Sequence, residues 1–157
     1  MSRILLPWQS RGGLRAKVNC YLLFVIGKKK MKIEKIDHLV LTVKDIEASC
    51  VFYTTVLGMQ EVSFEPGRKA VAFGDQKINF HQIGKELEPK ALHPTLGSGD
   101  LCFTTAEPMP EVIVHLQNMG IEIIEGPVKR TGASRLLTSV YVRDPDQNLI
   151  EISNYEN

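Results

Sequence analysis

The sequence predicts an α+β fold built from two tandem βαβββ modules. A strand, a helix and three strands can be traced through residues 33–84, and the same order returns through residues 99–155. A polar linker that contains prolines, residues 85–98, separates the two copies. With 157 residues, of which 43% are hydrophobic, the chain is long enough for one domain with a sizeable core.

The first module opens with a short run rich in Ile, Leu and Val at residues 35–43, which is typical of a strand. Asp45 is a good N-cap for the helix after it, because apolar residues then recur at helical spacing as far as Gly58. The segments EPGR and GDQ are turn sequences and divide the rest of the module into strands. Three strands are therefore expected, at residues 59–64, 69–73 and 77–83.

The second module has the same plan. Residues 99–105 form its first strand, Pro110 suits the first turn of a helix, and Gly120 ends that helix. The sequence DPDQN is a turn before the last strand. The remaining strands are expected at residues 121–126, 137–144 and 148–154.

Residues 1–31 differ from the rest of the chain in charge. They contain seven Lys or Arg residues and no Asp or Glu, so the remaining chain carries a net charge of about −6 against +1 for the whole. Arginines, serines and apolar residues in this mixture fit a mitochondrial transit peptide, but an upstream start or a disordered extension explains them as well and is favoured. We expect a basic extension over 1–31, a single domain over 32–157, and a cytoplasmic location with a mitochondrial one as the alternative.

The composition excludes several classes of function. The mildly acidic body has no basic face of the kind that binds nucleic acid. The apolar run CYLLFVIG, residues 20–27, is far shorter than the roughly 20 residues that a membrane-spanning helix needs. Three cysteines without CxxC spacing predict neither a disulfide framework nor a zinc knuckle, and favour a reducing compartment. The expected partner is a small molecule rather than a nucleic acid or a membrane.

Each module places one ionisable residue at the start of its first strand and another in its last strand. His38 and Asp100 open the first strands, and His81 and Glu151 lie at corresponding places in the last ones. An imidazole or a carboxylate on a buried strand face is costly unless it is paired or coordinates a metal. Two nitrogens and two carboxylates suit Zn, Mn, Fe, Co or Ni, so we predict a divalent metal of this group, although any one of these residues alone is more often structural.

Other polar residues have two interpretations. Asn79, Thr42 and Ser153 share strand parity with the predicted ligands, so they line the same face as substrate contacts or make ordinary interior hydrogen bonds. Arg143 is a candidate clamp for an anionic substrate, as are Arg130 and Arg135, and VKRTGASR, residues 128–135, is a basic loop of the kind that can close over a site. For each arginine alone a solvated surface position is favoured. His93, His115, Tyr53 and Met59 are interpreted as structural.

Four segments of the sequence resemble the vicinal oxygen chelate superfamily, which includes glyoxalase I, extradiol dioxygenases and fosfomycin resistance proteins. They are IDHLVLTV, FYTTVLGM, FGDQKINFHQIG and VRDPDQNLIEISN. The resemblance covers residues 33–155, and the DPD-x-N-x-x-E ending is its most specific part.

This resemblance implies a curved mixed sheet that forms a cup around a divalent metal. His38, His81, Asp100 and Glu151 match the four ligand positions of the family, and Asp100 is the least secure of them. Both histidines come from the first module, whereas glyoxalase I typically has a carboxylate in the place of His81 and a histidine in the place of Asp100. The set is therefore suited to a metal, but the reaction class cannot be carried over. The resemblance also admits a homodimer, with the site in one chain or shared between two.

The leading functional interpretation is a glyoxalase-like metalloenzyme of the lyase or isomerase type. It would act on a small vicinal-oxygen metabolite, with Glu151 as the base and the metal stabilising the developing oxyanion. The alternatives are a ligand-binding protein with the same cup and a metal-binding protein without turnover. If the sheet were ferredoxin-like instead, with no cup, His38 and Glu151 would not need to approach each other.

Overall fold

A computed structural model describes residues 30–156, and the chain divides into two units, Met1–Glu34 and Lys35–Asn157. The predicted transit peptide falls almost entirely on residues 1–29, which lie outside the described residues, so the two predicted locations stay predictions. Between residues 30 and 156, no helix has the length and apolar character that crossing a membrane requires. The second unit holds every helix and strand that the structure describes.

The first module consists of β1 (His38–Val43), α1 (Ile46–Thr55), β2 (Gln60–Phe64), β3 (Arg68–Phe73) and β4 (Gln76–Gln82). Asp45 is the N-cap of α1, as predicted, because its side chain accepts hydrogen bonds from the backbone N–H groups of Glu47, at 2.9 Å, and Ala48, at 3.1 Å. The strands form one sheet in the order β1-β4-β3-β2, in which β1 and β4 are parallel and the other pairs are antiparallel.

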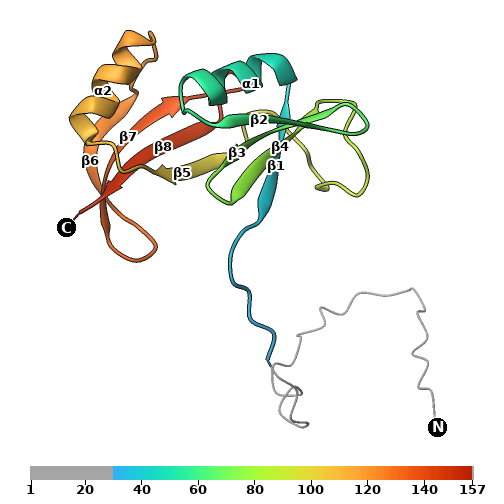
Figure 1. The fold of residues 1–157 in the computed structure, drawn as a ribbon, viewed down its shortest axis with the longest axis horizontal. Helices are drawn as coiled ribbons and strands as arrows, with labels where there is room; N and C mark the ends of the chain where they lie inside the picture. The colour runs from blue at the N-terminus through green and yellow to red at the C-terminus, as the bar shows by residue number, and fades with distance from the viewer. Residues whose placement is uncertain (1–29, 157) are drawn as a thin grey trace, which may run out of the picture. The chain divides into compact units, whose positions relative to one another are not determined.

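The second module repeats this arrangement with β5 (Asp100–Thr104), α2 (Met109–Asn118), β6 (Glu125–Thr131), β7 (Leu136–Arg143) and β8 (Leu149–Tyr155). Its sheet has the order β5-β8-β7-β6, again with one parallel pair, β5 and β8. Pro110 lies in the first turn of α2. Two four-stranded mixed sheets with two helices confirm the predicted α+β fold of two tandem βαβββ modules (Figure 1).

One strand of the second module is displaced from its predicted place. The segment 121–124 is not a strand, and β6 runs over Glu125–Thr131 instead, through Gly126 and Pro127. A β-bulge lies between Glu125 and Val128. Gly126 has φ +117°, and a Cβ there would lie 2.5 Å from the carbonyl oxygen of Ser139. The predicted loop 128–135 is therefore wrong in its first half, because residues 128–131 pair with β7 and only the turn around residues 132–135 remains.

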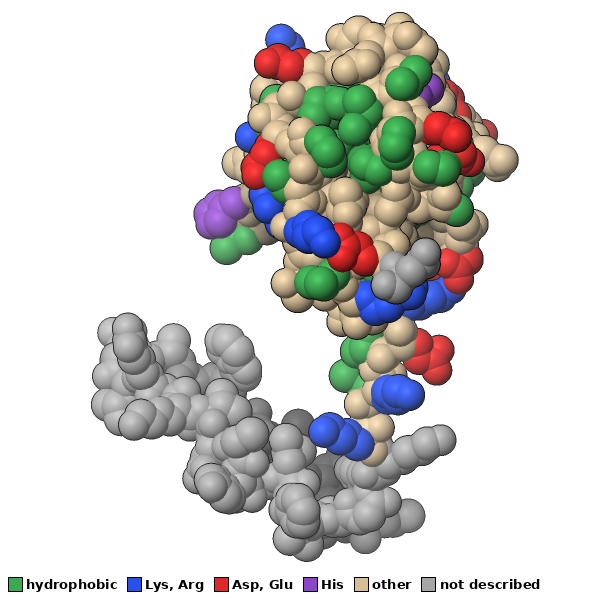
Figure 2. Space-filling view, turned by 90° about the vertical axis from the view of Figure 1, so that its left-hand side faces the viewer, with side chains coloured by type: hydrophobic (Ala, Val, Ile, Leu, Met, Phe, Trp, Pro, Cys, Tyr) green, Lys and Arg blue, Asp and Glu red, His purple; other side chains and the backbone are tan. Residues whose placement is uncertain are grey.

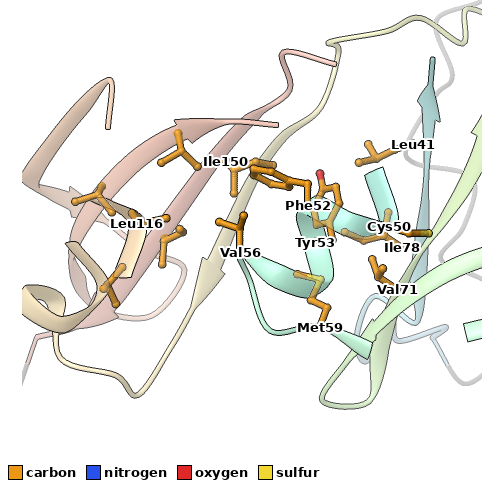
Figure 3. Packing of buried hydrophobic residues seen from close by; sticks show 14 of the residues in the cluster. Leu41, Cys50, Phe52, Tyr53, Val56, Met59, Val71, Ile78, Leu116 and Ile150 are labelled. Atoms are coloured by element: carbon orange, nitrogen blue, oxygen red, sulfur yellow. The ribbon is translucent and has the colours of Figure 1, made fainter. Parts of the chain in front are cut away.

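Each sheet has one face that packs on the helices and the core. The core is a single cluster that takes residues from both modules. Figure 3 shows Val56, the C-cap of α1, between Tyr53 of that helix and Leu116 and Ile150 of the second module. Tyr53 has no exposed surface and Met59 is 8% exposed, which confirms their prediction as core residues. We call the other face of each sheet, on which no described helix packs, its open face (Figure 1).

A buried polar cluster joins the two modules. The Tyr53 hydroxyl of α1 donates to Asp144 Oδ2 at 3.0 Å, and Asp144 is 2% exposed. Asp144 also accepts from the side chain of Asn148 at 2.7 Å, and Asn148 Oδ1 accepts from the backbone N–H of Gly99 at 2.7 Å. The DPDQN turn therefore has a structural role, because it satisfies buried groups from both modules.

The side of the domain on which α2 and β6 lie carries a gathering of hydrophobic side chains (Figure 2). Val114 is 54% exposed, Met119 43% and Ile124 44%. Val114 belongs to α2 and Met119 caps it, so this apolar surface is on the helix side of the second sheet. It is separate from the two open faces, where the predicted site residues lie.

Candidate functional site

The predicted residues of the first module lie on the open face of the first sheet. Along β1, His38, Val40 and Thr42 alternate with Leu41 and Val43, which are buried in the core. In the parallel pairing of β1 with β4, His38 is opposite Lys77, Val40 opposite Asn79, and Thr42 opposite His81. The open face therefore presents these six side chains together.

The predicted residues of the second module lie on the open face of the second sheet. In the pairing of β5 with β8, Asp100 is opposite Leu149, Cys102 opposite Glu151, and Thr104 opposite Ser153. Asp100 thus lies on β5 two residues before Cys102, the residue that pairs with Glu151 of β8. Both carboxylates therefore lie on the same face of two neighbouring strands.

The strand register corrects one predicted equivalence between the modules. Glu151 pairs with the residue two positions after Asp100, whereas His81 pairs with Thr42, four positions after His38. The first-module residue that corresponds to Glu151 is therefore Asn79, and His81 corresponds to Ser153. The predicted equivalence was wrong by two residues because a shift of two keeps the same face of the sheet, so that parity alone does not reveal it.

Glu151 is held by hydroxyl groups from two neighbouring strands. Ser139 of β7 donates to Glu151 Oε1 at 2.6 Å, and Ser153 lies 3.2 Å from the same oxygen. Ser139 and Ser153 are fully buried and are 2.8 Å apart, and Cys102 Sγ lies 3.4 Å from Ser153 Oγ. Both hydroxyls act on Oε1, which fixes the carboxylate and leaves Oε2 for a ligand or a proton.

A tyrosine and a cysteine beside Glu151 stay protonated. Tyr141 and Cys102 are its direct neighbours on β7 and β5. Burial raises the pKa of the Tyr141 hydroxyl, and burial likewise raises the pKa of the Cys102 thiol. Arg130 donates from Nε to the Tyr141 hydroxyl oxygen at 2.9 Å and also binds Glu125. The Tyr141 proton is therefore directed away from Arg130.

His38 is oriented for a ligand role by its neighbour in sequence. Its Nδ1 lies 2.7 Å from Asp37 Oδ1, and this contact lowers the pKa of the Asp37 carboxyl. A carboxylate on one imidazole nitrogen fixes the ring and leaves Nε2 for a metal, an arrangement that recurs around metal-binding histidines. The His38 side chain is 47% exposed, so Nε2 is open to an ion from outside the sheet.

Asn79 has an unused acceptor on the same face. Its Oδ1 is buried and has no hydrogen-bond partner among the described residues. A buried carbonyl oxygen without a donor costs about 1–3 kcal/mol, so a bound group that satisfied this oxygen would be stabilised by it. A divalent cation or a substrate hydroxyl would satisfy it, and both fit an open face that also carries His38.

His81 lies beneath the linker between the modules. A cavity of about 240 Å³ is lined by Val40, Thr42 and His81 from the sheet and by Pro89, Lys90, Ala91 and Pro94 from the linker. The linker therefore covers one end of the open face of the first sheet. His81 faces this small cavity, whereas His38 lies four residues away along the neighbouring strand.

The four predicted ligands form two pairs, one on each sheet. Within residues 30–156, no three His, Cys, Asp or Glu side chains gather in a way that could hold a metal ion. A larger cavity of about 640 Å³ lies between the end of α1, β5 and α2, and none of the four predicted ligands lines it. The larger cavity belongs to the junction of the modules, so we place the candidate site on the open faces, where the donor groups are.

The other predicted residues are accounted for by local contacts. Arg143 donates to the backbone carbonyl of Gln147 at 3.0 Å, and Arg135 stacks on Tyr155 with its Cζ 4.7 Å from the ring centroid. His115 Nε2 lies 2.9 Å from the Val56 carbonyl oxygen, a structural role as predicted. Ser139, Tyr141 and Cys102 were not singled out from the sequence. The alternation of strand residues around Glu151 places them on its face once the strand pairing is known.

Comparison with known proteins identifies the family of this chain. The family model described as the glyoxalase/bleomycin resistance protein/dioxygenase superfamily matches residues 35–152. That match spans nearly the whole of the second unit. This chain belongs to the glyoxalase superfamily.

Individual relatives extend the family match. The chain is 56% identical over 126 residues to virulence protein STM3117 of Salmonella typhimurium, covering 80% of this chain and 88% of that protein. The crystal structure of STM3117 covers 80% of this chain and 100% of its own, with a TM-score of 0.79. Glyoxalase domain-containing protein RDO1 of Mycosarcoma maydis is 52% identical over 150 residues, covering 96% of this chain and 76% of that protein.

A more distant structure shows the same fold. A point mutant of the fosfomycin resistance protein FosX of Listeria monocytogenes was solved in complex with Mn(II) and 1S,2S-dihydroxypropylphosphonic acid. It is 20% identical, covers 78% of this chain and 90% of its own, and has a TM-score of 0.54. Members of the glyoxalase superfamily are metal-dependent enzymes or binding proteins, and this chain has their fold.

Proposed function

We propose that the protein is a divalent-metal-dependent enzyme of the glyoxalase type, which acts on a small vicinal-oxygen metabolite with lyase or isomerase chemistry. The observation that carries this proposal is the setting of Glu151. Its carboxylate lies on an open face, one oxygen is fixed by Ser139 at 2.6 Å, and Asp100 lies on the adjacent strand. A fixed carboxylate with a free oxygen is the arrangement that a general base needs.

The proposed metal ligands are His38, Asp100 and Glu151, with a fourth from the first module. For that fourth ligand the sequence predicts His81, whereas the strand register favours Asn79. A divalent ion bound there, of the Zn, Mn, Fe, Co or Ni group, supplies Lewis-acid polarisation of a substrate oxygen. The imidazole of His38, oriented by Asp37, and the unpaired Oδ1 of Asn79 fit such an ion.

Glu151 is the proposed base. A weakly bound Oε2 would leave the metal and accept a proton from the substrate carbon next to the polarised oxygen, while Oε1 stays bound to Ser139. Tyr141, whose pKa is raised by burial, keeps its proton and can donate to an oxygen of the substrate. These two side chains are direct neighbours on β8 and β7, so the acceptor and the donor reach one substrate from the same face.

We further propose that a second copy of the chain completes the site. Half of the donor groups lie on the first sheet and half on the second, and β1 and β5 are the edge strands of those sheets. Val40 is apolar and 46% exposed on the open face between His38 and Thr42. In a homodimer, the first open face of one chain would cover the second open face of its partner and bury Val40.

Metal analysis tests the metal site. Full-length protein purified without chelator should hold about one equivalent of a divalent metal by mass spectrometry, and Glu151→Gln should lose most of it. Glu156→Gln is the matched control, because Glu156 undergoes the same loss of charge but binds Thr138 and Lys129 instead. Wild-type protein that takes up no metal even after loading would overturn the proposal.

Proton exchange tests the reaction. The metal-loaded protein is incubated in D₂O with a panel of α-hydroxycarbonyl compounds, and deuterium entry at the carbon beside the carbonyl is followed by proton NMR. A base at Glu151 predicts exchange with at least one compound, retained in Glu156→Gln and lost in Glu151→Gln even when excess metal restores the occupancy of that variant. Metal uptake without exchange of any compound would favour the non-catalytic binding protein.

A further inference from the structure

Two cations share one aromatic ring on the open face of the first sheet. The Arg68 Cζ atom lies 4.4 Å from the centroid of the Phe64 ring, and the Lys77 Nζ atom lies 4.8 Å from it. Phe64 pairs with Arg68 across β2 and β3, and Lys77 lies on β4 opposite Ala72. The ring can reach across the sheet because Ala70 and Ala72, between them, are small.

These two cations lack the carboxylate partners that other basic residues of the domain have. Lys69, next to Arg68 but on the opposite face, binds Glu47 at 2.7 Å and Glu61 at 2.8 Å, and these contacts raise its pKa. Among the described residues, no Asp or Glu oxygen lies within 4.0 Å of the charged nitrogens of Arg68 or Lys77. The Asp37 carboxylate, which binds His38, interacts with the charge of Lys77 at longer range and forms no ion pair with it.

Arg68 also has an unsatisfied donor. Its Nε is buried and has no hydrogen-bond partner in the part of the chain that the structure describes. Each cation gains only about 0.5–1 kcal/mol from a ring at an exposed site, and two like charges on one ring repel each other. A bound oxyanion would accept from Arg68 Nε and neutralise both charges, with the stronger charge-assisted hydrogen bonds that a guanidinium makes.

We propose that Arg68 and Lys77 form a subsite for an oxyanion group of the substrate, a carboxylate or a phosphoryl group. Lys77 is opposite His38 in the pairing of β1 with β4, so this subsite adjoins the proposed metal position. The substrate is therefore an anionic metabolite whose oxyanion lies on Arg68 and Lys77 while its vicinal oxygens face His38. The part of this inference that places the vicinal oxygens of the substrate at His38 rests on the proposed function. The anion subsite itself needs no metal.

Anion binding by the metal-free protein tests the subsite. Full-length protein is treated with chelator and titrated with inorganic phosphate, followed by phosphorus NMR, and with acetate, followed by proton NMR. Arg68→Gln and Lys77→Gln should each weaken the binding of the preferred anion by about tenfold or more. Arg135→Gln is the matched control, because Arg135 also stacks on an aromatic ring, Tyr155, but lies in the second module.

The preferred anion tells which group the substrate carries, because tighter phosphate indicates a phosphoryl group and tighter acetate a carboxylate. Failure of both anions to bind overturns the proposal, as does equal binding by wild type, Arg68→Gln and Lys77→Gln. Binding seen only after metal is restored also overturns it, because the anion would then occupy the metal, and the proposed function would stand. Binding retained without metal while metal uptake fails would support the subsite and contradict the metalloenzyme.

Discussion

The open faces of the two sheets have the same topology but differ in how their polar groups are satisfied. On the second face, Glu151, Ser139 and Ser153 are joined in one network, and Arg130 is bound to Tyr141 and Glu125. On the first face, Asn79 Oδ1 and Arg68 Nε have no partner among the described residues. On the second face, the proposed base is already held by its hydrogen bonds. The first face holds groups that need a ligand to be satisfied.

This comparison suggests a division of labour between the duplicated modules. The first module supplies cations, imidazoles and a free acceptor, the groups to which we assign binding of a substrate or a metal in our proposal. The second supplies Glu151, a carboxylate held by hydrogen bonds, which suits proton transfer. Both can act on one molecule only if the modules keep a defined position, which the Tyr53–Asp144 contact helps to set.

Removal of Asp144 would disturb both faces at once, and we expect the largest effect here. Asp144→Ala leaves the Tyr53 hydroxyl, the Asn148 amide and two backbone N–H groups without their acceptor. We expect the free energy of unfolding, measured with urea, to fall by about 3 kcal/mol. Asp146→Ala, which removes one exposed bond to the Lys44 N–H, should cost about 1 kcal/mol. Equal losses in the two variants would show that the buried bonds of Asp144 stabilise the domain no more than the single exposed bond of Asp146 does.

The second-largest effect is expected for the proposed metal ligand of the first module, for which Asn79 and His81 are the two candidates. If Asn79 corresponds to Glu151, Asn79→Ala should weaken metal binding by about a hundredfold, and His81→Ala should weaken it much less. Metal affinity is measured by competition with a chromogenic chelator. The reverse order would restore His81 as the ligand and would mean that strand register does not set the ligand positions.

The fixed state of Glu151 is tested by Ser139→Ala, for which we expect a loss of about tenfold in metal affinity. Thr138→Ala is the control from the other face of β7, where the hydroxyl donates to Glu156 at 3.0 Å. It should leave metal affinity unchanged. If both variants bind metal as well as the wild type does, the hydrogen bond to Glu151 is not part of the site.

The smallest expected effect concerns Cys102, which reports on the charge beside it. The Glu151 carboxylate adds to burial in raising the pKa of the Cys102 thiol, so Glu151→Gln should lower that pKa and increase the thiolate fraction at about pH 8. We expect alkylation of Cys102 by iodoacetamide to become roughly threefold faster, measured by peptide mass spectrometry. Cys50, 1% exposed and with a pKa raised by burial to about 11, is the internal control. Unchanged alkylation would mean that the Glu151 charge does not reach Cys102.

The fold could be predicted from the sequence because periodicity and turn residues are local signals. Asp45 caps α1 and Pro110 opens α2 as expected, since both act through their own backbone neighbours. The strand at Glu125–Thr131 was missed because a glycine and a proline within it are usually turn signals, whereas here they form a bulge. Ile121 and Ile123, which suggested the earlier strand, pack against the core instead.

The candidate site was less predictable because it depends on pairing between distant strands. Sequence parity places His81 and Asn79 on the same face of the first sheet. It does not say which of them occupies the position that corresponds to Glu151 in the second sheet. The support for Glu151 from Ser139 joins residues 12 apart in the chain, and no local pattern marks it. Arg68 and Lys77 likewise meet only through the ring of Phe64. Such contacts depend on the register, which sequence alone did not supply.

We propose that each metal site combines the first open face of one chain with the second open face of another. The metal content of two variants, His38→Ala and Glu151→Gln, is first measured for each variant separately after loading. The two variants are then mixed in equal amounts, unfolded, refolded together and loaded again. Random pairing makes half of the dimers mixed. If the site is shared, each mixed dimer regains one of its two sites, so the metal content should recover to about a quarter of the wild-type value. Refolded wild type, as the control, should bind metal fully. If the mixture then binds no more metal than the separate variants do, the site is not shared between chains and the proposal of a shared metal site is contradicted.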